Sequence, residues 1–134
     1  MNWDLSKLYQ GFDDAAFLKD IGSLEGAYAG LLAKAEKLDG PESLSALLRG
    51  VADAVTKEVR VALFVQLTLA AEATNESALA LVERLMAFDN GRRRVMSAVS
   101  NFMKDADVDT CAASDRFLAQ HKYLLVLLKR EAAH

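Results

Sequence analysis

The chain has 134 residues, of which 52% are hydrophobic, with seven glycines, one proline and a formal net charge of −3. This length suits one hydrophobic core and excludes two, and so few glycines and prolines disfavour a sheet protein with many tight turns. The slightly acidic balance gives no electrostatic basis for binding nucleic acid or an anionic membrane. We therefore expect one domain, residues 1–134, with no nucleic acid and no membrane as partner.

The amino terminus and the cysteine content indicate a cytoplasmic protein. Cys111 is the only cysteine, so no disulfide can form within the chain. The opening Met-Asn-Trp-Asp has neither the basic flank nor the apolar run of a signal peptide. The most apolar stretch, residues 59–71, is interrupted by Arg60 and Gln66 and is much shorter than the ~20 residues that a membrane span needs.

The first helix is predicted over residues 14–39. Its apolar residues recur at alternating steps of four and three, which places them on one stripe of a helix. Asp13 or Asp14 would cap its start, and Gly40 followed by Pro41 would end it. The stripe consists of Phe17, Ile21, Leu24, Tyr28, Leu31, Ala35 and Leu38.

The second helix is predicted over residues 42–73, with Glu58 as the one charged interruption of its stripe. Its centre, VRVALFVQLTLA, alternates like a strand over a few residues, but the helical phase continues on both sides and no turn signal brackets it. We therefore expect a helix that is buried on most sides. The stripe consists of Leu44, Leu48, Val51, Val55, Ala62, Val65 and Leu69.

The third helix is predicted over residues 76–104, with Thr74 or Asn75 as its cap. The dipeptide Asn90-Gly91 favours a hairpin only between alternating strands, so here we expect a kink or a short break. The stripe nevertheless keeps its phase across this dipeptide. It consists of Leu81, Leu85, Phe88, Arg92, Val95, Val99 and Phe102.

The last helix is predicted over residues 110–131, after a polar loop at 104–109, with Asp109, Thr110 or Ser114 as its cap. Its apolar side carries Phe117, Leu118, His121, Leu124, Leu125 and Leu128. The connections between all four helices are short, which favours antiparallel neighbours. The fold class predicted from the sequence is all-α, an antiparallel bundle of four helices with the middle two long.

The residues that carry metal or nucleophilic chemistry are too few for an active site. His121, His134 and Cys111 form no spacing typical of zinc or of a Cys-His nucleophile, and HExxH is absent. Glu131 and His134 form one Glu-x-x-His, but a di-metal bundle needs two, and the residue three before His121 is leucine. We therefore predict no catalytic, cofactor-binding or metal residue in this chain, and interpret His121 as a hydrogen-bonded residue at the edge of the core.

The run Arg92, Arg93 and Arg94 resembles a basic patch in the printed sequence. Successive residues of a helix point about 100° apart, so these side chains scatter around it. We interpret them as part of a solvated face with partners one turn away, such as Asp89.

Gly22, Gly26 and Gly30 repeat every four residues on the face turned away from the first helix's apolar stripe. Each glycine inside a helix costs ~1 kcal/mol relative to alanine. One interpretation is a second packing surface, where small residues let another backbone approach closely; the other is that an exposed face tolerates them. For the isolated domain we predict a homodimer or other homo-oligomer that uses this face or the apolar side of the last helix.

The opening of the chain resembles that of oligoendopeptidase F-like peptidases, WDLSxLY followed by FDDPxF. The matching residues are Trp3, Asp4, Leu5, Ser6, Leu8, Tyr9, Phe12, Asp13, Asp14 and Phe17, with Ala15 where many members have proline. Weaker similarity follows at Glu72-Ala73-Thr74-Asn75, close to A-x-x-T-x-[DN], and at Tyr123, Arg130 and His134, close to Y...R...PH. The resemblance thus extends along the whole chain, and the opening motif is its distinctive part.

The resemblance implies the non-catalytic amino-terminal domain of a zinc metalloendopeptidase that hydrolyses oligopeptides. In that family a helical region precedes a catalytic part with HExxH, a further glutamate ligand and substrate-contacting histidine and tyrosine residues, none of which has a counterpart here. Zinc, the oligopeptide substrate and the catalytic half that would be this domain's partner are therefore expectations about the parent enzyme. The domain would form part of the wall or cover of the substrate channel. The alternative is a stand-alone helical adaptor or oligomeric bundle that binds a protein or peptide.

Overall fold

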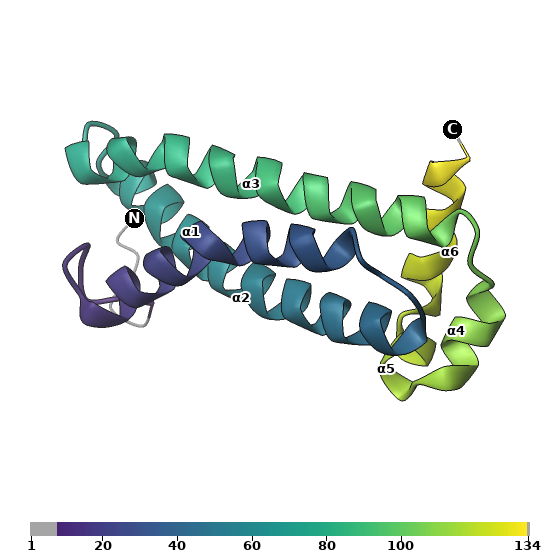
Figure 1. The fold of residues 1–134 in the computed structure, drawn as a ribbon. Coiled ribbons are helices and arrows are strands. Elements are labelled where there is room, and N and C mark those ends of the chain that lie inside the picture. Colours follow the sequence, from purple (N-terminus) through teal and green to yellow (C-terminus); the bar gives the residue numbers. More distant parts are fainter. Residues whose placement is uncertain (1–7, 134) are drawn as a thin grey trace.

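Three long helices form the body of the molecule in a computed structural model, which describes residues 8–133. They lie side by side and are joined by short connections at alternate ends (Figure 1). These helices are α1 (Ala15–Ala35), α2 (Pro41–Ala71) and α3 (Glu76–Met103). Within the described residues there is no strand, so the predicted all-helical class is confirmed.

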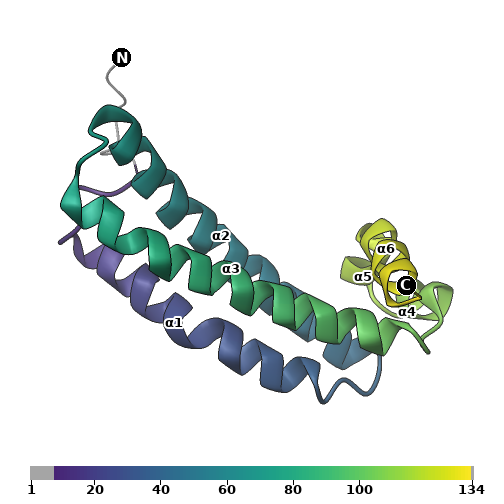
Figure 2. The ribbon, with the colours of Figure 1, turned by 90° about the horizontal axis from the view of Figure 1, so that it is seen from above.

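Three short helices follow and gather at one end of the long ones, as seen from above in Figure 2. They are α4 (Val108–Ser114), α5 (Arg116–Gln120) and α6 (Lys122–Ala132). In Figure 1, α6 runs across the direction of the long helices. None of the helices in the described part of the chain combines the length and the apolar character needed to cross a membrane.

The first long helix begins and packs as its sequence predicts. Of the two aspartates considered as caps, Asp14 has this role, because its side chain accepts a hydrogen bond from the Ala16 N–H at 2.8 Å. The buried residues of α1 are those of the predicted stripe up to Ala35. The helix ends there, and Leu38 lies in the connection to α2.

The second helix continues through residues 59–71, so their strand-like alternation does not produce a strand. Pro41 occupies its first turn, where its missing N–H costs nothing. Asn75 caps the third helix through a 2.9 Å hydrogen bond from the Ala78 N–H.

The prediction of a kink or a short break at Asn90 and Gly91 is wrong, because α3 continues as one helix through both residues. Gly91 instead lets α1 approach α3: a Cβ atom at this position would lie 2.9 Å from the Cβ of Tyr28. Gly50 likewise lets α2 approach α1, since a Cβ atom at this position would lie 2.8 Å from Cδ2 of Leu31. These two glycines therefore mark the sides of α2 and α3 that face α1.

The single last helix predicted over 110–131 is also wrong, and with it the bundle of four helices, because this segment is divided into α4, α5 and α6. Asp115 has extended backbone (φ −156°, ψ 135°), and its side chain accepts hydrogen bonds from the N–H groups of Phe117 (2.7 Å) and Leu118 (3.2 Å). Asp107, outside the three predicted caps, likewise starts α4 by accepting from the Asp109 N–H. Apolar spacing could not reveal these helix starts, because they depend on capping bonds: Asp107 starts α4, and Asp115 separates α5 from α4. The break between α5 and α6 falls at His121, whose side chain forms no capping bond.

An aromatic cluster fixes the segment before α1 to the long helices. It consists of Tyr9, Phe12, Phe17 and Phe64, whose rings contact one another mostly edge to face, with centroids 5.0 Å apart for Tyr9 and Phe17. The Tyr9 hydroxyl donates a 2.7 Å hydrogen bond to Asp20, which also lies 3.8 Å from Arg60 of α2. The opening of the described chain is thus held by both α1 and α2.

Candidate functional site

The glycine face of α1 is open. Gly22, Gly26 and Gly30 are exposed, and a Cβ atom at any of the three would have no neighbouring heavy atom within 4 Å. Gly26 and Gly30 line a shallow groove of about 300 Å³ between α1 and α2. No backbone of the described chain makes use of these glycines, so their role as a packing surface stays a prediction.

The apolar side of the last predicted helix is used within the domain. Leu118, Leu125 and Leu128 are buried there. Tyr123 is the large apolar residue that α6 leaves in solvent, with 76% of its surface exposed. Self-association through this side, which the sequence led us to expect, stays a prediction.

His121 is exposed, so its predicted place at the edge of the core is wrong. Its Nδ1 donates a 2.8 Å hydrogen bond to the Phe117 carbonyl oxygen, and its ring lies 4.3 Å from the Phe117 ring. The Arg49 guanidinium lies 4.5 Å from the same ring. His121 thus stabilises the junction of α5 and α6. His134, and with it the pair with Glu131, lies outside the described residues.

The remaining residues with metal or nucleophilic chemistry form no constellation in the described chain. Cys111 is buried, and desolvation raises the pKa of its thiol, with the nearby charge of Asp107 acting in the same direction. A thiol of this kind carries little of the reactive thiolate. Among residues 8–133 there is no group of three histidine, cysteine, aspartate or glutamate side chains that could hold a metal ion.

The three consecutive arginines of α3 separate as helix geometry requires. Arg93 forms an ion pair with Asp89 at 3.0 Å, as the spacing suggests, whereas Arg92 turns inward. Arg92 donates a 2.8 Å hydrogen bond to Oε2 of Glu58, and it also pairs with Asp89. The Tyr28 hydroxyl donates to Oε1 of the same glutamate at 2.7 Å.

This buried network connects all three long helices at one level. Glu58 has both carboxylate oxygens bonded and only 8% of its surface exposed. Burial raises the pKa of Tyr28, and its hydrogen bond to Glu58 raises it further, so the hydroxyl remains a donor. The sequence carried a signal for this network, because Glu58 and Arg92 interrupt two apolar stripes, but helix spacing alone did not pair them.

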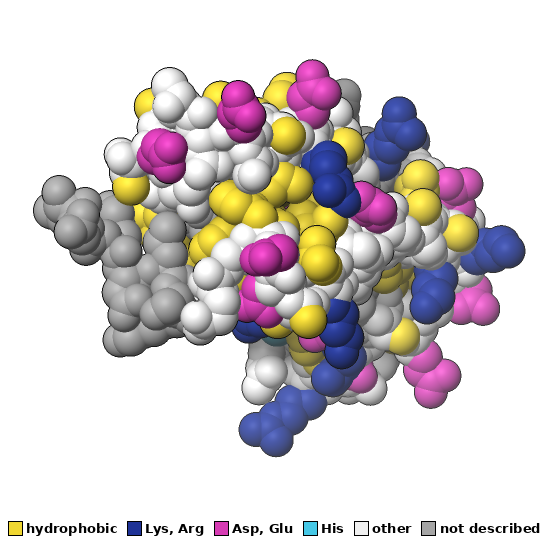
Figure 3. All heavy atoms as spheres, turned by 90° about the vertical axis from the view of Figure 1, so that its left-hand side faces the viewer, with side chains coloured by type: hydrophobic (Ala, Val, Ile, Leu, Met, Phe, Trp, Pro, Cys, Tyr) yellow, Lys and Arg dark blue, Asp and Glu magenta, His cyan; other side chains and the backbone are white. Residues whose placement is uncertain are grey.

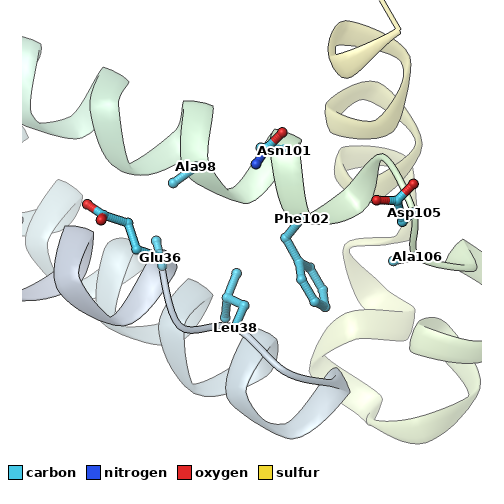
Figure 4. Close-up of a pocket in the computed structure, with 8 residues that line it drawn as sticks. Glu36, Leu38, Ala98, Asn101, Phe102, Asp105 and Ala106 are labelled. Atoms are coloured by element: carbon cyan, nitrogen blue, oxygen red, sulfur yellow. The ribbon is translucent and has the colours of Figure 1, made fainter.

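A groove of about 680 Å³ lies between the end of α1 and the end of α3 (Figure 4). Leu38 and Phe102 extend into it, and Glu36, Asn101 and Asp105 stand around it. Its lining includes no histidine, cysteine or lysine, so it lacks a pairing of nucleophile and base. Its chemistry is that of a shallow surface groove with two carboxylates.

A second surface, on α2 and α3, is unusually apolar. We call it the α2–α3 face, and it is defined by five exposed residues: Val59 (57% exposed), Leu63 (41%), Leu79 (50%), Val82 (37%) and Met86 (62%). Val59 and Leu63 are four positions apart on α2, and Leu79, Val82 and Met86 follow one another at three and four positions on α3, so each set shares one side of its helix. Clustered apolar exposure of this kind is typical of an interaction surface.

The two glycines that contact α1 show where this face points. Val59 follows Gly50 by nine residues, and Val82 precedes Gly91 by nine residues. At about 100° per residue, nine residues turn a helix by about 180°. Both valines therefore lie on the side opposite α1, and the α2–α3 face is the outer side of this helix pair.

Comparison of the chain with family models, with curated proteins and with solved structures finds no match. No relative therefore assigns a role to the network, the groove or the α2–α3 face. Their chemistry rests on the geometry described above.

Proposed function

We propose that this chain is the non-catalytic amino-terminal domain of an oligoendopeptidase F-like zinc metalloendopeptidase, in which it forms part of the wall or cover of the substrate channel. The resemblance of the opening motif carries this proposal. The motif residues Trp3 to Ser6 lie outside the described residues, but those from Leu8 to Phe17 have clear structural roles. Tyr9, Phe12 and Phe17 build the aromatic cluster, and Asp14 caps α1.

Such roles explain why a motif of this kind would persist at the entry to a helical scaffold. A channel wall must keep its shape while peptides pass, and long helices held by a packed core supply that rigidity. The aromatic cluster and the Tyr28–Glu58–Arg92 network together fix α1 against α2 and against α3.

Zinc belongs, in this proposal, to the catalytic part of the parent enzyme. The residues described here do not fit a catalytic zinc ion, because no three potential ligands come together in them. The chain would contribute shape to the channel, and the catalytic half would contribute the metal, its HExxH ligands and the general base.

The test is the gene beyond codon 134 and the activity of its longer product. We expect an in-frame continuation that reaches an HExxH, and a longer product that cleaves a quenched fluorescent oligopeptide in a reaction stopped by a zinc chelator. Residues 1–134 alone should not cleave it. A stop codon after His134 without a peptidase gene following, or a continuation without HExxH, would remove the proposed activity.

The alternative function, a stand-alone helical adaptor or oligomeric bundle, is favoured by one observation, the α2–α3 face. Five exposed apolar residues on one side of two helices are suited to a protein or peptide partner. The same gene sequence distinguishes the two functions, because an adaptor requires no catalytic continuation.

A further inference from the structure

The α2–α3 face occupies the position where a further long helix would pack. In an antiparallel helix bundle each helix lies in the groove between two neighbours. Here α1 lies on one side of the α2–α3 pair, and the other side carries the five exposed apolar residues. The short helices α4 to α6 lie at one end of the long helices, where α6 packs against α3, and Figure 2 shows them on the side of α2 away from α1. The part of that side nearer the α2–α3 connection carries the five residues and is exposed within the described chain.

The length of the face can be worked out from the Glu58–Arg92 contact, which sets α2 and α3 at one level. Val59 lies one residue beyond this level towards the α2–α3 connection, and Leu79 lies thirteen residues beyond it. At a rise of ~1.5 Å per residue, the apolar residues extend over about 18 Å. A helix of about 12 residues, or three turns and a little more, covers that length.

Two acidic residues flank the α3 part of the face, whereas the basic Arg93, seven residues after Met86, is held in an ion pair with Asp89. Glu83 lies four residues after Leu79 and three before Met86, so it is their neighbour on the helix surface, and Glu76 lies three before Leu79. Both glutamates are exposed, and neither forms an ion pair within the described chain. Figure 3 views this end of the molecule and shows acidic side chains along its upper edge, where α3 begins.

We propose that the α2–α3 face binds one amphipathic helix of a partner protein or segment, with an apolar stripe against the five residues and lysine or arginine along the flank beside Glu76 and Glu83. The partner helix completes a four-helix arrangement with α1, α2 and α3. This inference does not depend on the peptidase assignment, because the catalytic half of a peptidase or the partner of an adaptor can equally supply such a helix.

A second copy of the chain fits this face less well. Pairing the face with itself would bring the unpaired glutamates of two acidic chains to the same interface, and like charges there oppose association. A helix with basic flanking residues turns the same glutamates into attractive contacts. Charge complementarity therefore selects a basic amphipathic helix as the occupant.

The test uses two synthetic 15-residue peptides with the same leucine stripe at helical spacing, one with lysines along one flank and one with glutamates in their place. Binding to the full chain is measured by fluorescence anisotropy of the labelled peptide. We expect the lysine peptide to bind about five-fold more tightly, as two exposed charge pairs contribute. Equal affinity for both peptides, or no saturable binding of the lysine peptide, would overturn the proposal.

Matched variants distinguish this face from general charge attraction. The double variant Glu76→Lys/Glu83→Lys should reverse the preference, while Glu36→Lys/Asp105→Lys, with the same change in net charge at the groove of Figure 4, should keep the lysine peptide preferred. Circular dichroism of each variant confirms that it is folded. A reversal by both double variants would mean that net charge governs binding, and would refute a site at this face.

The apolar contact is tested with Met86→Lys, which should weaken binding of the lysine peptide about ten-fold or more. Leu18→Lys is the control, because Leu18 is also an exposed large apolar residue but lies on α1. Equal loss in both variants would contradict the proposal. Sedimentation of the chain alone tests the other occupant, and a dimer that Met86→Lys dissociates would replace the partner helix with a second copy.

Discussion

Replacing Glu58 with alanine should show how much the buried network contributes to stability. The substitution removes the acceptor of the Tyr28 hydroxyl, which sits on a residue only 4% exposed, and it takes one carboxylate partner from Arg92. A buried donor left without a partner costs ~1–3 kcal/mol. Breaking a fully buried ion pair costs ~3–5 kcal/mol, but the Arg92 side chain is 31% exposed and keeps Asp89, so its share is smaller.

Adding these contributions, and subtracting the few tenths that alanine gains in a helix, gives a loss of about 2.5 kcal/mol in the free energy of unfolding. For a domain of this size the midpoint of thermal unfolding should fall by about 10 °C. Circular dichroism at the helix band, recorded as temperature rises, measures the thermal midpoint. The same signal recorded in urea measures the free energy of unfolding and its slope with urea concentration. The slope should stay constant if only stability changes.

Glu83→Ala is the matched control, because Glu83 is exposed on α3 and forms no ion pair within the described chain. It should change the free energy of unfolding by less than about 0.5 kcal/mol. A double-mutant cycle of Glu58→Ala with Tyr28→Phe should give a coupling of about 1 kcal/mol, as expected for two groups in contact. If Glu58→Ala is no more destabilising than Glu83→Ala, the network does not hold the three helices and the reasoning is refuted.

Gly91→Ala should lower the free energy of unfolding by about 1–3 kcal/mol, because its Cβ would lie 2.9 Å from the Cβ of Tyr28. Gly26→Ala should raise it by about 0.5–1 kcal/mol, because a Cβ there meets no neighbouring atom within 4 Å. Changes of the same sign in urea unfolding of both variants would contradict the close contact at Gly91. Hydrogen bonds from the Gln10 and Ala16 N–H groups lower the pKa of Asp14. The stability that its carboxylate contributes is therefore present above the ordinary pKa of 3.8 and is lost as pH falls through the lower pKa of the folded state. The difference in free energy of unfolding between the native chain and Asp14→Ala should shrink in that pH range, and a constant difference would show that the carboxylate charge does not stabilise the helix start. Metal analysis after dialysis should find no stoichiometric zinc on the isolated chain, and one tightly bound zinc ion per chain would show that ligands had been overlooked.

The long helices could be predicted from the sequence, because each is encoded by local features that act at short range. The stripe from Phe17 to Ala35 corresponds to the buried side of α1, and Asp14, Pro41 and Asn75 stand where helix starts were expected. Periodicity and capping depend on residues within one or two turns, so they can be recognised without knowing what packs against the helix.

The last part of the chain shows where such local reasoning fails. Cys111, Leu118 and Leu125 are seven residues apart and all buried, and this spacing suits one straight helix as well as three short ones. The division between α4 and α5 depended on Asp115, whose side chain accepts hydrogen bonds from the backbone N–H groups of Phe117 and Leu118 and so starts a new helix.

The roles of the charged residues in the apolar stripes could be seen only in the packed molecule. Glu58, Arg92 and Tyr28 come from three helices and lie up to 64 residues apart in sequence, so no local pattern could join them. The glycines show the same limit: Gly91 permits a close approach and Gly26 faces open space, although both are simply glycines within helices. The α2–α3 face likewise became visible only once the packing of α1 had fixed which sides of α2 and α3 remain in solvent, because exposure depends on the partner that covers a helix and not on the helix alone.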